Sequence, residues 1–238
     1  MLQVYTTIQT KMKKFILFPL LFPTLLFAQV KLSDLSRKNG LAYEKNAVVP
    51  FTGKAYGYYP DGAKQIIMEY KDGLGSGELK SWYDKGELQI AGFTSKGQKT
   101  GTWKLYYENS KLKKQTIYSN DLEKGEEILW FENGNMQKKG SYVDGKLNGK
   151  YEWYYENGQK QQEGYFVNGK EDSTWQEWYN DGKPKMRGQF YNLEKNGEWI
   201  WWDEQGNVTT SKIYNNGLVQ SDNDKIDTYL EKMQAFQS

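Results

Sequence analysis

The residues of this chain that could do chemistry are carboxylates, lysines and tyrosines, because its 238 residues include no Cys and no His. That absence excludes Ser-His-Asp and Cys-His nucleophilic sites, Cys/His zinc sites, haem ligation by His or Cys, and disulfide bonds. The carboxylates show one regular pattern, in which an acid recurs at multiples of 24 residues: Asp84, Glu108, Glu132, Glu156 and Glu204.

This row of acids does not predict an enzyme. If each 24-residue unit is one β-hairpin, neighbouring acids stand about 9.6 Å apart, near the upper limit for an inverting glycosidase and well beyond the ~5 Å of a retaining one. A catalytic acid also needs burial to raise its pKa, and a row along a sheet margin offers none. We therefore predict that the protein is not an enzyme and has no catalytic residue, no cofactor and no metal ligand.

Aromatic side chains form a second regular pattern and give the candidate binding residues. Aromatic residues make up 16% of the chain and hydrophobic residues only 37%, so rings on a thin sheet must replace a thick aliphatic core. The rings either cover the sheet backbone or bind an extended polymer such as a glycan or a peptide strand. The candidate binding surface is one row at 24-residue spacing: Trp82, Tyr106, Trp130, Tyr154, Trp178 and Trp202.

The elements that must position these side chains are 24-residue units, which begin with Gly or Ser at residues 53, 77, 101, 125, 149, 173 and 197. In a typical unit an extended run ends in two aromatics at the sixth and seventh places, followed by a turn pair such as Asn157-Gly158. A second extended run has an aromatic at the eighteenth place and ends at another turn, such as Asp144-Gly145. This pattern predicts one β-hairpin per unit, and seven units predict an array of stacked hairpins over residues 53–220.

The units differ in how well they keep the pattern. The fifth unit, residues 149–172, keeps every signal, and its Trp153 is expected in the core. The third unit has Ser110 and Asp121 where other units have turn glycines, and the sixth has Pro184 and Leu193. These two units are expected to be the least stable.

The motif Gly-x-Trp-x-x-Tyr-Tyr-x-x-Gly, nearly whole in residues 149–173 and repeated at 101–109, resembles the bacterial variant of the MORN repeat. The resemblance covers residues 50 to about 220 and implies an all-β fold, an elongated single-layer antiparallel sheet of consecutive hairpins without catalytic residues. Many bacterial relatives are labelled antitoxins, a role that an exported chain could not perform on a cytoplasmic toxin. Wall-binding repeats of the choline-binding kind are also similar, but their unit is shorter.

Residues 1–28 predict a secretory signal peptide, with Lys13-Lys14 before an apolar run from Phe15 to Phe27. Met12 is a more natural start than Met1. A membrane anchor is the alternative, although the run is short for a membrane span and contains two prolines. Without residues 1–28 the chain has 29 Lys and Arg against 30 Asp and Glu, which argues against a nucleic-acid partner.

The two ends of the array predict caps. Residues 29–52 are expected to form an N-terminal cap of one or two strands, in which Leu41, Tyr43, Val48 and Phe51 cover the open end. Residues 221–238 predict a C-terminal capping helix with one apolar stripe, or else a helix that docks on another protein. The functional prediction is an exported, non-enzymatic scaffold for protein-protein or cell-envelope contacts, located in the periplasm, envelope or outside the cell. The alternative is a carbohydrate-binding module that uses its aromatic rows.

Overall fold

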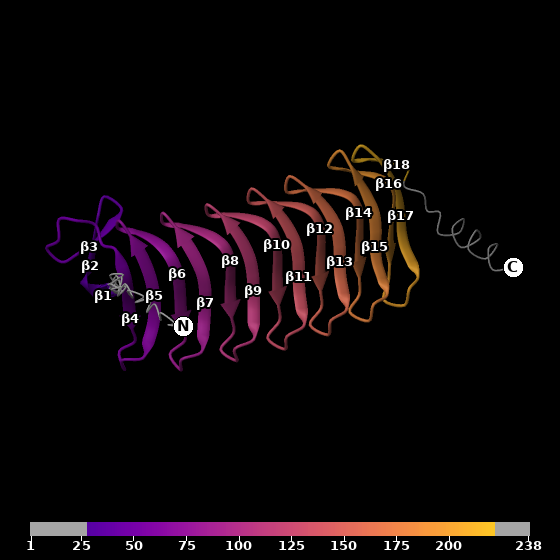
Figure 1. Cartoon of the computed structure of the whole chain (residues 1–238). Coiled ribbons are helices and arrows are strands. Elements are labelled where there is room, and N and C mark those ends of the chain that lie inside the picture. Colours follow the sequence, from indigo (N-terminus) through magenta and orange to yellow (C-terminus); the bar gives the residue numbers. More distant parts are fainter. Residues whose placement is uncertain (1–27, 222–238) are drawn as a thin grey trace, which may run out of the picture.

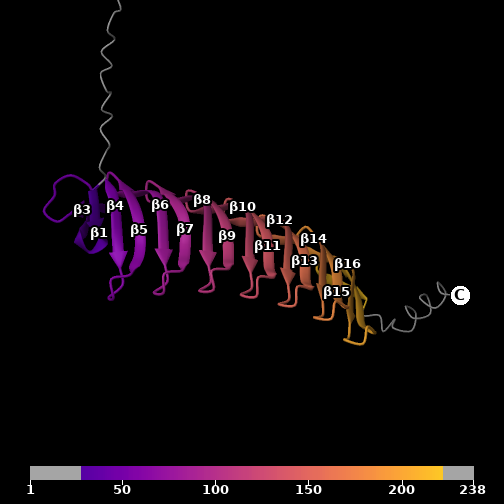
Figure 2. The ribbon, with the colours of Figure 1, turned by 60° about the horizontal axis from the view of Figure 1, so that its bottom comes forward.

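The computed structural model describes residues 28–221, which form one elongated β-ribbon (Figure 1). Its main sheet has 16 strands in the order β1, then β4 through β18. From β5 on, each strand pairs antiparallel with the strand before it, whereas β4 pairs parallel with β1. Figure 2 shows the strands side by side along the ribbon, with their connections at its two long margins. The predicted all-β single sheet of consecutive hairpins is therefore confirmed.

The strands of the main sheet have the following bounds: β1 Ala28–Lys31, β4 Gly53–Tyr58, β5 Lys64–Lys71, β6 Leu74–Trp82, β7 Leu88–Ser95, β8 Gln98–Tyr106, β9 Leu112–Ser119, β10 Leu122–Trp130, β11 Met136–Val143, β12 Lys146–Tyr154, β13 Lys160–Val167, β14 Lys170–Trp178, β15 Pro184–Tyr191, β16 Glu194–Trp202, β17 Val208–Asn215 and β18 Leu218–Ser221. Residues 28–221 contain no α-helix. The predicted C-terminal helix lies outside the described residues, apart from Ser221, which ends β18. The predicted signal peptide also lies outside them, apart from Ala28, which begins β1.

The N-terminal segment packs against the first hairpin of the array. The short 3-10 helix η1 (Leu32–Asp34) follows β1, and β2 (Leu35–Lys38) and β3 (Leu41–Glu44) form a separate two-stranded sheet. Ala42 of β3 and Phe51 belong to a buried cluster with Ala55 and Tyr70. Val48 is 91% exposed, so the prediction that it helps to cover the array is wrong. It lies in the irregular segment after β3, where nothing holds its side chain against the sheet.

Each unit has two turns. The hairpin turn, such as Asn157-Gly158, joins the two strands of a unit, and the closing turn, such as Asp144-Gly145, joins the unit to the next one. The two turns differ in backbone conformation, although the sequence shows Asp-Gly or Asn-Gly at both. At the closing turns both residues have positive φ, for example 49° at Asp144 and 75° at Gly145, as a two-residue hairpin turn requires. At the hairpin turns only the second residue of the pair has positive φ, for example 88° at Gly158 and 63° at Ser110. There the Gln159 backbone N–H donates to Oδ1 of Asn157 at 3.0 Å, so the Asn caps a wider turn.

Leu193 occupies the closing-turn position where every other unit except the third has glycine, and its φ is 70°. A left-handed backbone costs a residue with a branched side chain about 1–2 kcal/mol, and the side chain is 45% exposed, so little burial offsets this cost. Leu193→Gly is therefore expected to raise the free energy of unfolding by about 1 kcal/mol. Urea titration checks this. The reciprocal change at the equivalent position, Gly169→Leu, should destabilise the chain, and equal stabilities for all three proteins would contradict the argument.

Pro184, the other departure in the sixth unit, is the first residue of β15 and pairs with Trp178 beside a register shift. Proline is tolerated at the first residue of a strand and at bulges, because no ladder hydrogen bond from its nitrogen is needed there. The expectation that it weakens an internal strand is therefore not supported by its position.

The buried rings lie on one face of the sheet, which we call the inner face. The third place of the unit supplies four of them, each at most 7% exposed: Trp103, Tyr151, Trp175 and Trp199. Each ring packs against a glycine of the preceding strand. A Cβ added to Gly164 would lie 2.0 Å from Cε3 of Trp175, so only glycine leaves room for the ring. From Tyr151 to Tyr214 the inner-face rings form a continuous series of edge-to-face contacts with centroids 5.0–6.2 Å apart.

Trp153 is not the core ring of the fifth unit, because its side chain is 36% exposed. The buried ring is Tyr151, two residues earlier on the same face, and Trp153 leans against its edge with centroids 6.1 Å apart. The sequence motif alone could not separate these two aromatics.

Tyrosines at the seventh place join each unit to the next. The Tyr155 hydroxyl donates to the backbone oxygen of Trp178 at 2.9 Å, and Tyr59, Tyr83, Tyr107 and Tyr179 make the equivalent bond at 2.7–2.8 Å. Phe131 lacks the hydroxyl. At that junction the Asn133 and Asn135 side-chain amides donate to the backbone oxygen of Glu156, each at 2.9 Å.

Tyr155→Phe is expected to lower the free energy of unfolding by about 1 kcal/mol, because it leaves the Trp178 carbonyl without this partly buried donor. Denaturant titration measures the change. The matched control is Phe131→Tyr, which supplies the missing hydroxyl next to the carbonyl of Tyr154 and should not destabilise the chain. If Tyr155→Phe left the free energy of unfolding unchanged, these bonds would not hold the units together.

Candidate functional site

The six aromatic residues predicted as a binding surface lie in one row on the outer face, opposite the buried rings. We call it the ring row. Each residue ends a strand directly after a register shift, as Tyr154 ends β12 and pairs with Lys160 of β13. Each side chain is half-buried. The row consists of Trp82, Tyr106, Trp130, Tyr154, Trp178 and Trp202, and its cross-strand partners are Leu88, Leu112, Met136, Lys160, Pro184 and Val208.

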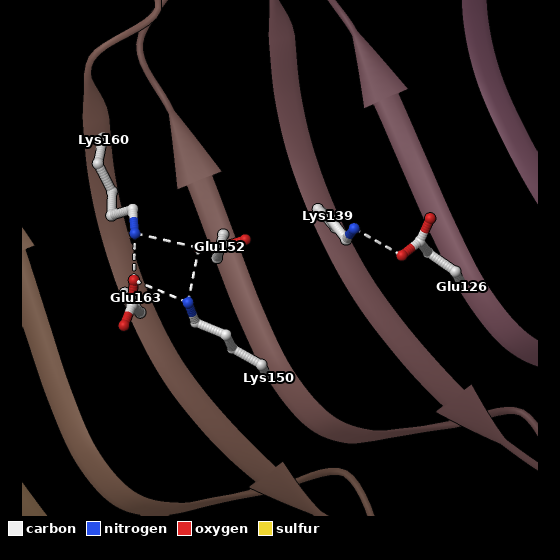
Figure 3. A network of polar contacts seen from close by, with 6 residues as sticks. All are labelled: Glu126, Lys139, Lys150, Glu152, Lys160 and Glu163. Atoms are coloured by element: carbon white, nitrogen blue, oxygen red, sulfur yellow. Dashed lines mark hydrogen bonds and ion pairs between the residues drawn. The ribbon is translucent and has the colours of Figure 1, made fainter.

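The middle of the outer face carries ion pairs (Figure 3). Lys139 pairs with Glu126 at 2.7 Å, and Lys150 pairs with Glu152 at 2.9 Å and with Glu163 at 3.3 Å. Lys160 also contacts both of these glutamates. Burial raises the pKa of Glu152, but the hydrogen bonds from Lys150 and Lys160 outweigh burial and hold the pKa below its ordinary value. These charges neutralise one another in the part of the outer face formed by β10 to β13.

The outer face also carries a second row of apolar side chains, which the sequence pattern did not predict. We call it the exposed row, because its apolar side chains are 36–57% exposed: Phe93, Ile117, Val143, Tyr165, Val167, Tyr191 and Ile213. Tyr165 and Val167 flank the inner-face residue Phe166, so the alternation of the strand places them on the outer face. The row lies at the margin of the closing turns, away from the ring row. In the sequence, this row could have been predicted from the apolar residues at the seventeenth and nineteenth places of the units.

The inner face has one polar break in its series of rings. Glu127 of β10 occupies a third place and is 3% exposed. Its carboxylate pairs with Lys114 at 2.6 Å and Lys138 at 3.0 Å, and it accepts hydrogen bonds from Thr116 at 3.2 Å and Tyr142 at 3.3 Å. Burial raises the pKa of Glu127, but the hydrogen bonds and charges of the two lysines outweigh it and lower the pKa. The carboxylate has four partners among the surrounding side chains, so this cluster is structural.

The acids at the eighth place, Asp84, Glu108, Glu132, Glu156 and Glu204, are exposed at the hairpin turns. The structure keeps them one to a turn and does not gather them into a pair. Across the described residues no group of three or more Asp and Glu side chains is placed to hold a metal ion. These acids are therefore spread along one margin of the ribbon, one to a turn.

Comparison with known families agrees with this architecture. Four stretches match the family model described as the MORN repeat variant, namely residues 51–72, 99–120, 123–144 and 147–168. The matches coincide with the hairpins β4–β5, β8–β9, β10–β11 and β12–β13, and they confirm the resemblance at these units. Together they span less than half of the chain. No curated protein gives a significant match. Within residues 28–221 no helix is long and apolar enough to cross a membrane.

Proposed function

We propose that the protein is an exported, non-enzymatic repeat scaffold that binds other proteins at the cell envelope. In this proposal all seven 24-residue units between residues 53 and 220 act as MORN-like repeats, including the three outside the matched stretches. The observation that carries the proposal is the exposed row, because a series of apolar side chains left open to solvent along one margin is typical of an interaction surface.

The composition of the exposed row favours a protein partner over a sugar. Ile117, Val143, Val167 and Ile213 are aliphatic, and sugar rings stack on aromatic faces, whereas aliphatic side chains pack well against protein side chains. Lys150, the cross-strand partner of Tyr165, is paired with Glu163, and the whole chain has a net charge of only +2, so there is no large positive charge that would favour nucleic acid.

Carbohydrate binding is the second candidate function, and the ring row favours it. Its half-buried rings recur once per unit, about 9.6 Å apart, and could stack on successive sugars of an extended glycan. Purified peptidoglycan and polysaccharide test this directly. Retention of the chain by glycan alone, lost on changing the ring row, would favour the carbohydrate function over the protein scaffold.

The protein scaffold is tested by affinity capture from envelope extracts with the full chain and two triple variants. One variant carries Ile117→Ser, Tyr165→Ser and Tyr191→Ser in the exposed row. The control carries Lys113→Ser, Glu171→Ser and Lys185→Ser at exposed polar positions of β9, β14 and β15. A single stoichiometric partner should be retained by the wild type and the control and lost by the first variant. Equal retention by all three would reject the exposed row as the interface.

Export is tested by cell fractionation with N-terminal sequencing. The mature chain is expected outside the inner membrane and should begin near Gln29 or Val30. Cleavage after Ala28 would remove one residue of β1 and keep the pairing of Gln29 with Lys54. An intact cytoplasmic chain would contradict export and return the antitoxin role to consideration.

A further inference from the structure

The repeat distance of the ring row matches one peptide conformation. Equivalent rings stand two strands apart, which is about 9.4–9.8 Å. A polyproline II helix has three residues per turn and rises about 9.3 Å per turn, so every third residue would meet one ring. Two turns of an α-helix rise about 10.8 Å, and an extended strand repeats on one face every ~6.6 Å, so both lose register along the row. We propose that the ring row binds a proline-rich segment in the polyproline II conformation.

The surface of the ring row suits this ligand. From Trp82 to Trp130 its rings alternate with Leu88, Leu112 and Met136 on the neighbouring strands, which gives a half-buried apolar track. Lys160 interrupts this track beside Tyr154, and its ammonium lies 5.8 Å from the centroid of the Trp178 ring. Proline-rich segments dock on aromatic-lined grooves, because their stiff backbone loses little entropy on binding. The ion-paired strip of Figure 3 meets the ring row at Lys160, which pairs with Tyr154 across the strands and contacts Glu152.

The ring row also provides hydrogen-bond donors of the required kind. Within the described residues the indole N–H groups of Trp82, Trp130, Trp178 and Trp202 have no acceptor, and none of them is buried. On the inner face, by contrast, the Trp103 indole N–H donates to the backbone oxygen of Phe93 at 3.0 Å. A polyproline II backbone makes no internal hydrogen bonds, so its carbonyls are available to these donors.

Charge at the hairpin margin specifies the ligand further. The turn segments 59–63, 83–87, 107–111, 131–135, 155–159, 179–183 and 203–207 contain nine acids and three lysines, although the whole chain has a net charge of +2. Among described residues Asp84, Glu108, Glu132 and Glu156 form no ion pair. Lys111 donates to the backbone oxygen of Asn133, and Lys183 donates to the backbone oxygen of Glu204 and pairs with Asp181 at 3.0 Å. The complementary ligand carries Lys or Arg at every third position, on the side that faces these turns.

This inference rests on the proposed function, since it takes the chain as a scaffold for polypeptides, but it concerns the ring row and not the exposed row. The experiment titrates the full chain into a labelled 18-residue peptide of six Pro-Pro-Lys repeats and measures fluorescence anisotropy. Two control peptides are used. One replaces each Pro-Pro with Gly-Ser, and the other has the composition of the first but places all six lysines at one end.

The Pro-Pro-Lys peptide is expected to bind at least about tenfold more tightly than either control. Trp130→Ala combined with Trp178→Ala should weaken its binding about tenfold or more, whereas Trp153→Ala on the inner face should leave it unchanged. Trp130→Phe keeps an aromatic ring and loses the indole donor, so it should weaken binding less than the alanine variant does. Because this change disturbs the packing less, it shows whether the loss of binding in the alanine variant is due to misfolding.

Equal binding of the Gly-Ser peptide would show attraction by charge alone, and no binding of the Pro-Pro-Lys peptide would reject the inference outright. Either result leaves the proposed function standing if the exposed-row variant still loses its captured partner. The inference would be overturned if the exposed-row triple variant abolished peptide binding while the changes at Trp130 left it unaffected. The peptide site would then lie on the exposed row.

Discussion

Trp175→Ala is expected to lower the free energy of unfolding by about 4 kcal/mol, the largest effect of any single truncation in the middle of the array. The ring is 6% exposed and lies over the backbone of Gly164. It also contacts Phe166 and Phe190 edge to face, with centroids 5.5 and 6.2 Å away. The cavity left by the ring cannot close easily, because glycine has no side chain that could fill it. Urea titration followed by circular dichroism measures the loss.

Trp153→Ala is the matched control, because it removes the same side chain from the same face of the neighbouring hairpin. At 36% exposure it should cost about 1–2 kcal/mol. Gly164→Ala tests the same contact from the other side and should also destabilise the chain, since its Cβ would collide with the Trp175 ring. If Trp153→Ala cost as much as Trp175→Ala, the inner-face row would not be the core.

Glu127→Ala is expected to lower the free energy of unfolding by about 3 kcal/mol, because it leaves two lysines without the carboxylate that neutralises them. The side chains of Lys138 and Lys114 are 17% and 29% exposed, so water can replace the lost partner only in part. The control is Glu126→Ala, one residue earlier on the outer face. Its ion pair with Lys139 is 44% and 41% exposed, and the change should cost within about 0.5 kcal/mol.

The same cluster sets a pH dependence. The pKa of Glu127 is lowered in the folded state, so its stabilising effect is present above the pKa of the unfolded chain and is lost as pH falls through the folded pKa. Burial and the nearby Glu127 raise the pKa of Tyr142 to about 12. The stabilising effect of the neutral Tyr142 hydroxyl is therefore lost in alkali, as pH rises toward that value. Stability measured against pH should therefore fall at both ends, and Glu127→Gln should flatten the acid limb. An unchanged acid limb would show that Glu127 does not titrate as its contacts require.

The sequence by itself determined the hairpin array. A period of 24 residues, with turn residues at fixed places, specifies which strands pair, because hairpin contacts are local and the turn chemistry sets their register. The row of six aromatics was also found from spacing alone, since equivalent places in stacked hairpins must lie in line.

Only the tertiary structure decided which side chains are buried and which are open to a partner. The unit has aromatics at several places, and a shift of one residue in register exchanges the two faces of a strand. The register shift before each sixth place, and the glycine that faces each third-place ring, are relations between strands and cannot be read along one. For this reason Tyr151 and not Trp153 is the core ring, and Glu127 finds Lys114 and Lys138 on the strands at either side. The exposed row likewise became visible only when burial separated the outer face from the inner one.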